Sequence, residues 1–272
     1  MDAVSKWKTE VEAWAIPEEI LSAAPESPWG YPPEFQRLTK EALRKKGSFS
    51  ARKALEVMPI AGRCMDIGVG TGAASLPLTS KAFLIVGVDP SAERLQEFEL
   101  LASSLGVQAK RIQGDWPQAV KRVTHADVVI SHHLLYNIPD IGPFVQAMDN
   151  RALLRVVIEI TSEHPQAWMN DLWLHFHGLE RPSDPTAKDA HAAIKQLGIK
   201  AEIHEEMTKP VPSGFEDKKD AVALVRKRLC LPADKDDEIA EALGDRLWMH
   251  DEGLYTAGPR EQSVATIWWD SS

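Results

Sequence analysis

Three glycines at alternate positions form the run of the sequence most suited to binding a ligand. Gly68, Gly70 and Gly72 follow an apolar stretch that ends at Ile67, within Cys64-Met-Asp-Ile-Gly-Val-Gly-Thr-Gly-Ala73. A strand followed by such a turn presents backbone N–H groups and a helix start to a ligand, and glycine lets that ligand approach the main chain. The spacing therefore predicts a nucleotide-type binding loop.

The residue two positions before the first glycine separates two kinds of ligand. Gly68, Gly70 and Ala73 also match the dinucleotide pattern G-x-G-x-x-G/A, so the glycines alone leave the ligand open. A carboxylate at Asp66 would repel the pyrophosphate of a dinucleotide, whereas it would attract a cationic amine or sulfonium. Asp66 therefore favours a cationic ligand.

With Asp66 included, the glycine run resembles the first motif, Asp/Glu-x-Gly-x-Gly-x-Gly, of the Rossmann-like class I S-adenosylmethionine-dependent methyltransferases. Later motifs of that family are matched in order over about residues 61–161. These matches are Val86-Gly-Val-Asp89, Gln113-Gly-Asp115-Trp-Pro and Ala126-Asp-Val-Val-Ile-Ser131. The resemblance implies that S-adenosylmethionine donates a methyl group and leaves as S-adenosylhomocysteine.

The resemblance also implies roles for single residues. Asp89 is expected to accept both ribose hydroxyls and Asp115 the exocyclic amine of adenine, with Trp116 against the adenine ring. From the residues alone, Asp89 could instead cap the helix expected over Ala92–Leu105, Asp115 could cap the turn that follows it, and Trp116 could be core packing. The predicted donor-binding residues are Asp66, Gly68, Gly70, Gly72, Asp89, Asp115, Trp116 and Ser131.

Two adjacent histidines follow the predicted fourth strand, whose end borders the reacting methyl group in the family. Methyl transfer from a sulfonium is an in-line displacement, and a hydroxyl or ammonium acceptor must also lose a proton. His132 is the first candidate for the group that removes this proton or orients the acceptor, and His133 is the second. Packing or a backbone hydrogen bond is the alternative interpretation of either ring.

Aromatic and acidic side chains could shape the acceptor pocket, although ordinary packing explains the N-terminal aromatics equally well. The expected pocket residues are Trp29, Tyr31, Phe35, Tyr136 and Glu159. Because residues two apart on a helix face different directions, His175 and His177 are not expected to share a metal ion. No metal site is predicted.

Charge and missing motifs narrow the acceptor. The 40 acidic and 31 basic side chains give a formal charge of −9, which disfavours phosphate backbones. Cys64 lies in the first strand and not after the fourth, where cytosine-carbon methyltransferases commonly carry a nucleophilic cysteine. We expect a small-molecule acceptor. The alternatives are an RNA or protein acceptor, a non-catalytic S-adenosylmethionine-binding module, or a nicotinamide-dependent dehydrogenase, which would leave Asp66 and Asp115 unexplained.

Length and composition fit a soluble globular protein. The chain has 272 residues, of which 44% are apolar, and no apolar stretch reaches the ~18 residues needed to span a membrane. Its first twenty residues lack the apolar core of a signal peptide, and two cysteines make no disulfide framework. These features predict a cytoplasmic protein.

Apolar runs alternate with amphipathic stretches of helical length, which predicts a doubly wound α/β fold with a seven-stranded, mostly parallel sheet in a three-layer αβα sandwich. The resemblance implies that the last strand is antiparallel. The expected strands are Arg63–Val69, Phe83–Asp89, Gln108–Gln113, Asp127–Ser131, Arg155–Thr161, Lys200–Met207 and Ser263–Trp269. The expected helices are Lys6–Trp14, Ala51–Met58 begun by Ser50, Ala92–Leu105, Pro165–His177, Thr186–Leu197, Asp217–Leu229 and Asp234–Trp248.

The domain prediction follows from this alternation. Residues 1–58 are expected to form a helical cover on the acceptor side. Residues 59–272 are expected to form the Rossmann-like methyltransferase domain, with a helical insertion at about 209–260. Neither the cover nor the insertion has enough apolar length for a core of its own, so both are expected to lie over one sheet.

Overall fold

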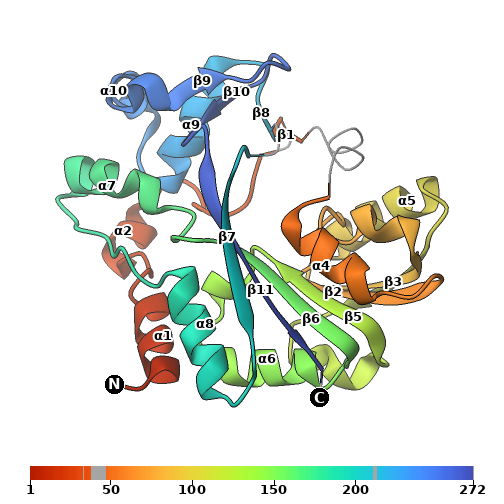
Figure 1. Cartoon of the computed structure of the whole chain (residues 1–272). Coiled ribbons are helices and arrows are strands. Elements are labelled where there is room, and N and C mark those ends of the chain that lie inside the picture. The colour runs from red at the N-terminus through yellow and green to blue at the C-terminus, as the bar shows by residue number, and fades with distance from the viewer. Residues whose placement is uncertain (33, 38–46, 211–212, 272) are drawn as a thin grey trace.

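The computed structural model describes residues 1–32, 34–37, 47–210 and 213–271, and it contains one large twisted sheet (Figure 1). In the described part of the chain this sheet has seven strands in the order β4-β3-β2-β5-β6-β11-β7. β11 pairs antiparallel with both β6 and β7, and the other pairs are parallel. The strands are β2 (Gly62–Ile67), β3 (Ala82–Asp89), β4 (Gln108–Gln113), β5 (Ala126–His132), β6 (Ala152–Thr161), β7 (Glu202–Thr208) and β11 (Gln262–Asp270). The predicted fold class and the antiparallel last strand are confirmed.

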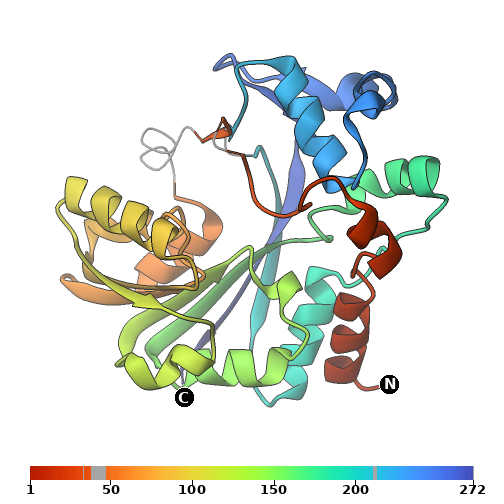
Figure 2. The same cartoon turned by 180° about the vertical axis from the view of Figure 1, so that it is seen from behind.

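Helices cover both faces of the sheet, as the two opposite views show (Figures 1 and 2). On one face, α4 (Phe49–Val57) and α5 (Ala92–Ser104) enclose an apolar cluster. On the other face, α6 (Ile141–Asp149) and α8 (Ala187–Gln196) enclose the largest cluster, and α1 (Ala3–Glu12) packs outside them. The three layers place the carboxyl ends of β2, β3, β5 and β6 at one edge, where open α/β sheets bind ligands.

The N-terminal cover is part of the main core at its first helix. The indole of Trp7 in α1 is 1% exposed, and its N–H donates to the carbonyl of Ile138 at 2.8 Å. Lys6 of the same helix pairs with Asp189 in the first turn of α8. Helix α1 therefore fastens the loop after β5 to α8, on the side of the sheet away from α4.

The insertion and the second N-terminal helix share a third apolar cluster. It joins α2 (Glu18–Ala23), α7 (Asn170–His177), α9 (Lys218–Arg228) and α10 (Asp236–Leu243). Two small ribbons complete this region, β1 (Gln36–Arg37) with β8 (Ser213–Gly214), and β9 (Leu247–Met249) with β10 (Tyr255–Ala257). The N-terminal cover and the insertion therefore meet in one shared apolar cluster, to which α7 also contributes.

Several predicted boundaries are wrong for local reasons. The helix expected over Asp234–Trp248 ends at Leu243, because Gly244 adopts a positive φ of 51° and Trp248 joins β9. The helix expected from Pro165 begins at Asn170 instead. Helix α4 starts at Phe49 with Ser48 as its cap, so Ser50 lies inside the helix. The insertion is therefore mixed α/β and not purely helical.

Helix α6 escaped the sequence analysis because its first turn contains Gly142 and Pro143, which usually mark loops. Proline is tolerated there because the first turn of a helix leaves its N–H groups without intrahelical partners. The glycine run leads into a short 3₁₀ turn over Leu76–Ser80 and not into the expected α-helix.

Replacing Trp7 with alanine should destabilise the protein by about 3–5 kcal/mol, because the change removes a fully buried indole and leaves the Ile138 carbonyl without its donor. The matched control is Trp29→Ala. Trp29 is 52% exposed, so its loss should cost less than about 0.5 kcal/mol. Denaturant unfolding of the two variants measures the difference, and equal losses would contradict this placement of α1.

Candidate methyl-donor and acceptor site

The glycine loop follows β2 with three left-handed backbone conformations. Gly68, Gly70 and Gly72 have φ values of 74°, 52° and 94°, which side chains other than glycine rarely adopt. A Cβ at Gly68 would lie 2.7 Å from Leu134, and one at Gly72 would lie 2.8 Å from Phe98. A Cβ at Gly70 would meet nothing within 4 Å. The first and third glycines thus allow close packing, whereas the second faces open space.

Asp66 lies beneath this loop as a buried carboxyl group. Its side chain is 0% exposed, and neither oxygen has a hydrogen-bond partner among the described residues. Burial raises the pKa of Asp66 to about 7. The hydroxyl and backbone N–H of the nearby Ser75 act against this rise, and the charge of Asp89 adds to it. A buried carboxylate without a partner is costly, so this group favours a positively charged ligand.

Asp89 ends β3 and joins the two neighbouring loops. Its Oδ2 accepts from the Gly70 N–H at 2.9 Å, and its Oδ1 accepts from the Ser91 N–H at 2.9 Å. Each carboxylate oxygen keeps a second lone pair, so the side chain can accept further hydrogen bonds from ligand hydroxyls. Ser91 in turn caps α5, which fixes where the carboxylate points.

The remaining predicted donor-binding residues lie on neighbouring strand ends. Asp115 is exposed just after β4. Trp116 is buried, and its indole N–H donates to the Phe144 carbonyl in α6 at 3.1 Å. Ser131 is also buried and donates to the Ile67 carbonyl at 3.0 Å, which links β5 to the start of the glycine loop. Trp116 and Ser131 therefore have structural partners of their own.

The acceptor-side candidates gather around Glu159 at the end of β6. Its Oε1 lies 3.7 Å from Nδ1 of His132 and 3.3 Å from Nε2 of His133. Its Oε2 accepts a hydrogen bond from the hydroxyl of Ser50 in α4. Nδ1 of His133 lies 3.1 Å from the hydroxyl of Tyr136. The structure therefore brings together both histidines, Tyr136 and Glu159, as the sequence suggested.

The surroundings of this cluster determine which of its side chains are charged. Burial by itself would raise the pKa of Glu159, but His132, His133 and the Ser50 hydroxyl more than offset it and lower the pKa to about 2. Burial lowers the pKa of His132 and raises that of Tyr136. At neutral pH the cluster thus holds an ionised Glu159 beside a neutral His132 and a neutral Tyr136.

The N-terminal aromatic residues Trp29, Tyr31 and Phe35 differ in their ring contacts. The rings of Tyr31 and Phe35 stack at 4.3 Å, and Phe35 meets Phe215 of the insertion at 5.3 Å. The guanidinium of Arg228 lies 5.1 Å from the Tyr31 ring centroid. Trp29, by contrast, is 52% exposed and has no ring contact among those that the structure shows. The structure therefore joins Tyr31 and Phe35 to the insertion and leaves Trp29 outside.

Three residues at this edge were not predicted as acceptor-side residues. The rings of Trp14 and His164 stack at 3.6 Å, and the Tyr136 ring approaches His164 at 5.7 Å. Burial, together with the charge of Arg181, lowers the pKa of His164 to about 3, so this ring is neutral. The third residue is Ser50. Nothing local marks any of them, because their neighbours come from distant parts of the chain.

Other clusters of polar side chains lie away from this edge. His175 faces Glu238, and His177 lies 2.7 Å from the Leu229 carbonyl, so the two rings have separate partners. Over residues 1–32, 34–37, 47–210 and 213–271, no three His, Cys, Asp or Glu side chains are placed to hold a metal ion. None of the helices in these ranges is both long and apolar enough to cross a membrane.

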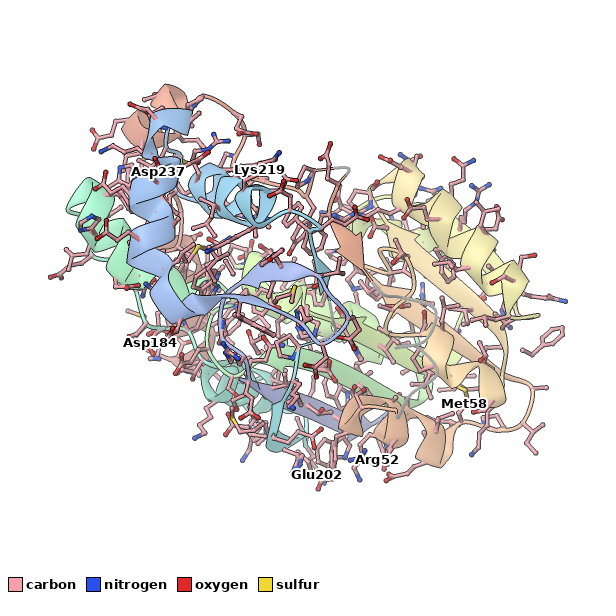
Figure 3. The ribbon with its side chains drawn as sticks, turned by 90° about the horizontal axis from the view of Figure 1, so that it is seen from above. Arg52, Met58, Asp184, Glu202, Lys219 and Asp237 are labelled. Carbon is pink, nitrogen blue, oxygen red and sulfur yellow. The ribbon has the colours of Figure 1, made fainter. Side chains whose placement is uncertain are left out.

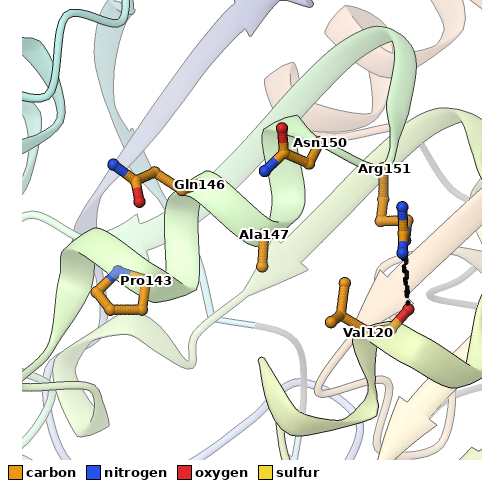
Figure 4. A pocket seen from close by; sticks show the side chains of 6 residues that line it. All are labelled: Val120, Pro143, Gln146, Ala147, Asn150 and Arg151. Atoms are coloured by element: carbon orange, nitrogen blue, oxygen red, sulfur yellow. Dashed lines mark hydrogen bonds between the residues drawn. The ribbon is translucent and has the colours of Figure 1, made fainter.

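The insertion helices and a surface hollow beside α6 are two further features of the molecule. From above, α9 and α10, near Lys219 and Asp237, lie apart from α4, which carries Arg52 and leads to Met58 (Figure 3). A surface hollow lies beside α6 (Figure 4) and is lined by Val120, Pro143, Gln146, Ala147, Asn150 and Arg151. Because its last two residues precede β6, this hollow is at the amino end of that strand, opposite the glycine loop.

Comparison with known proteins agrees with this geometry. The family model described as a methyltransferase domain matches residues 64–152. Residues 64–152 therefore match a methyltransferase domain, and the large sheet has the class I, Rossmann-like fold. The match runs from β2, the strand before the glycine loop, through β5 to the start of β6. It includes Asp66, Asp89 and both candidate histidines. A comparison of this chain with curated proteins returned no match.

Solved structures resemble this chain in fold alone. The YcgJ protein from Bacillus subtilis is 14% identical with a TM-score of 0.50, and the match covers 82% of this chain and 97% of that one. A cyclopropane-fatty-acyl-phospholipid synthase-like protein from Lactobacillus casei is 12% identical with a TM-score of 0.52, and the match covers 96% of this chain and 99% of that one. At such identities the likeness identifies the architecture and leaves the acceptor open.

Replacing Asp66 with asparagine should stabilise the ligand-free protein in a pH-dependent way. The folded-state pKa, about 7, lies above the ordinary value of 3.8, so the wild type loses stability as pH rises from about 4 to about 7. The variant escapes this loss. Thermal unfolding should therefore show a gap in Tm that widens over this range and then stays constant.

A gap that is the same at every pH would contradict the buried, unpartnered state of Asp66. The control is Asp140→Asn, since Asp140 is exposed and pairs with Lys8 on the surface. Its gap should stay small throughout.

Proposed function

We propose that this methyltransferase transfers a methyl group from S-adenosylmethionine to a small-molecule acceptor. The observation that carries the proposal is the buried Asp66 carboxylate without a partner, under a loop whose central glycine faces open space. A donor with an ammonium and a sulfonium group supplies the positive charge that this carboxylate lacks. A dinucleotide pyrophosphate would place negative charge there instead.

The residues present fit such a donor. Asp66 would attract its cationic end, the glycine loop would admit it to the main chain, and Asp89 would accept from its ribose hydroxyls. Asp115, exposed at the end of β4, would accept from the adenine amine, with Trp116 as the apolar wall behind it. When bound, the donor supplies an electrophilic methyl carbon, and the chain's own task is to align the acceptor and exclude water.

A small acceptor is favoured by what surrounds the Glu159 cluster. Tyr31 lies close enough to Tyr136 to influence its pKa, and its ring stacks on Phe35, which meets Phe215 of the insertion. Trp14 stacks on His164, whose ring approaches that of Tyr136. Enclosed sites with aromatic walls and a few polar groups suit small ligands, and the formal charge of −9 disfavours nucleic acid.

Replacing Asp89 with alanine should weaken binding of S-adenosylhomocysteine at least tenfold. The change removes both the expected ribose acceptor and the bond that fixes the Gly70 N–H. Asp127→Ala is the matched control, because Asp127 also accepts from a backbone N–H, that of Arg63, but at the opposite end of the sheet. Calorimetric titration compares the two variants, and equal affinities would remove Asp89 from the donor site.

The acceptor class is tested by transfer of label from methyl-labelled S-adenosylmethionine. Incubation with separate metabolite, RNA and protein fractions should label the metabolite fraction. Label in RNA or protein alone would replace the small acceptor by a macromolecule. Donor binding without label in any fraction would indicate a binding module and contradict the proposed catalysis.

A further inference from the structure

The donor site leaves one connected set of polar groups unused. It runs from Tyr136 through His133 to Glu159, at the edge where β5 and β6 end. Leu134, between the first two, lies against Gly68, so this set adjoins the loop that the proposed function assigns to the methyl donor. A group in this place acts on the acceptor and not on the donor's nucleoside.

The direction of the hydrogen bonds follows from elementary chemistry. Nε2 of His133 lies 3.3 Å from Oε1 of Glu159, and because an ionised carboxylate can only accept a hydrogen bond, this neighbour favours the tautomer that carries the proton on Nε2. In a neutral ring Nδ1 is then the acceptor, and it lies 3.1 Å from the Tyr136 hydroxyl, which donates to it. Glu159 thus selects one tautomer, and that tautomer gives Tyr136 a base to which it can pass its proton.

In addition to the side-chain contact, the backbone of His133 is held next to Glu159. His133 adopts a φ of 52°, a conformation unusual for a residue other than glycine, and its N–H donates to the Glu159 carbonyl at 2.7 Å. Strained conformations of this kind are found preferentially at functional sites. Ser50 holds the other oxygen of the same carboxylate from α4. Three elements therefore maintain the geometry of one imidazole.

We propose that Tyr136, His133 and Glu159 form a proton relay in which the Tyr136 hydroxyl is the catalytic group that contacts the acceptor, and that the acceptor is therefore an O–H or N–H nucleophile. His133 acts through Tyr136, and Glu159 and Ser50 are positioning residues. His132 has a different place, since it is buried and its Nδ1 lies 3.7 Å from Glu159. The proposal rests on the proposed function and names its acceptor chemistry.

Methyl transfer and proton transfer occur together in this relay. A bond forms between the acceptor heteroatom and the methyl carbon while the bond from that carbon to the sulfonium sulfur breaks, leaving its electron pair on a neutral thioether. The acceptor proton passes to the Tyr136 oxygen as the phenolic proton passes to Nδ1 of His133. The resulting imidazolium is stabilised by Glu159. Tyr136 stays neutral throughout, which agrees with the upward shift of its pKa by burial.

The relay is first tested without an acceptor, by nitrogen NMR of histidine-labelled full-length protein at neutral pH. His133 should be in the Nε2–H tautomer, and Tyr136→Phe should shift its Nδ1 resonance by removing the donor. An Nδ1–H tautomer, or an unchanged resonance in the variant, would overturn the relay. Tyr255→Phe removes a phenol from β10 and should leave the spectrum of His133 as in wild type.

The second test uses the label-accepting fraction and the product itself. Tyr136→Phe should lower kcat roughly 100-fold, as expected for loss of acid–base catalysis, with KM for S-adenosylmethionine within twofold of wild type. The labelled product should carry its methyl on oxygen or nitrogen. Wild-type kcat in the variant, or methyl on carbon or sulfur, would overturn the proposal. Failure of the proposed function is recognised separately, as absence of S-adenosylhomocysteine binding to the wild type.

The dependence of kcat on pH is a further test, because a purely structural role of Tyr136 would leave the shape of this profile unchanged. The titratable groups facing His133 are Glu159 from β6, His132 from β5, Tyr136 from the following turn, and Tyr31 and His164 around Tyr136. Tyr136→Phe should remove the limb of the kcat profile that depends on the base, and should abolish any solvent deuterium isotope effect. A profile that keeps the same limb in the variant would contradict the relay.

Discussion

The hydrogen bond from the Gly70 N–H to Asp89 is the interaction on which the arrangement of the donor site depends. It ties the glycine loop after β2 to the end of β3, and through Ser91 to the start of α5. Positive φ at Gly68 and Gly72 lets the loop reach that position. Asp66, at the end of β2 and two residues before the loop, is buried and has no hydrogen-bond partner among the described residues.

A second buried carboxylate organises the acceptor side by a different route. Glu159 is also buried but is satisfied by Ser50 and the two histidines, which keep it ionised. The two carboxylates thus differ in the way that their roles require. In our proposals, Asp66 pairs with a cationic group of the ligand, and Glu159 holds the His133 imidazole in one tautomer.

The sequence could predict the sheet and the donor loop because both are encoded locally. Apolar runs of strand length gave all seven strands of the large sheet to within a few residues, and Asp66 and Asp89 flank strand ends that any parallel sheet brings together. The same reasoning placed both histidines and Glu159 at one edge. It missed α6, where Gly142 and Pro143 imitate a loop.

The rest depends on contacts between distant segments. Ser50 reaches Glu159 across 109 residues, and Trp14 stacks on a histidine 150 positions away, so no local pattern marks either. The third apolar cluster forms only when α2, α7 and the insertion meet. Trp29 and Tyr31 are both exposed, and the stacking of Tyr31 on Phe35 is likewise not marked by any local pattern.

The central claim is that the buried Asp66 and the glycine loop hold S-adenosylmethionine. Thermal unfolding with S-adenosylhomocysteine, S-adenosylmethionine or a nicotinamide dinucleotide tests it most directly. A ligand at ~100 times its dissociation constant adds ~2.7 kcal/mol, which corresponds to roughly 5–10 °C for a chain of this size. The account predicts such a shift with the two sulfur compounds alone. A shift with the dinucleotide alone would contradict it.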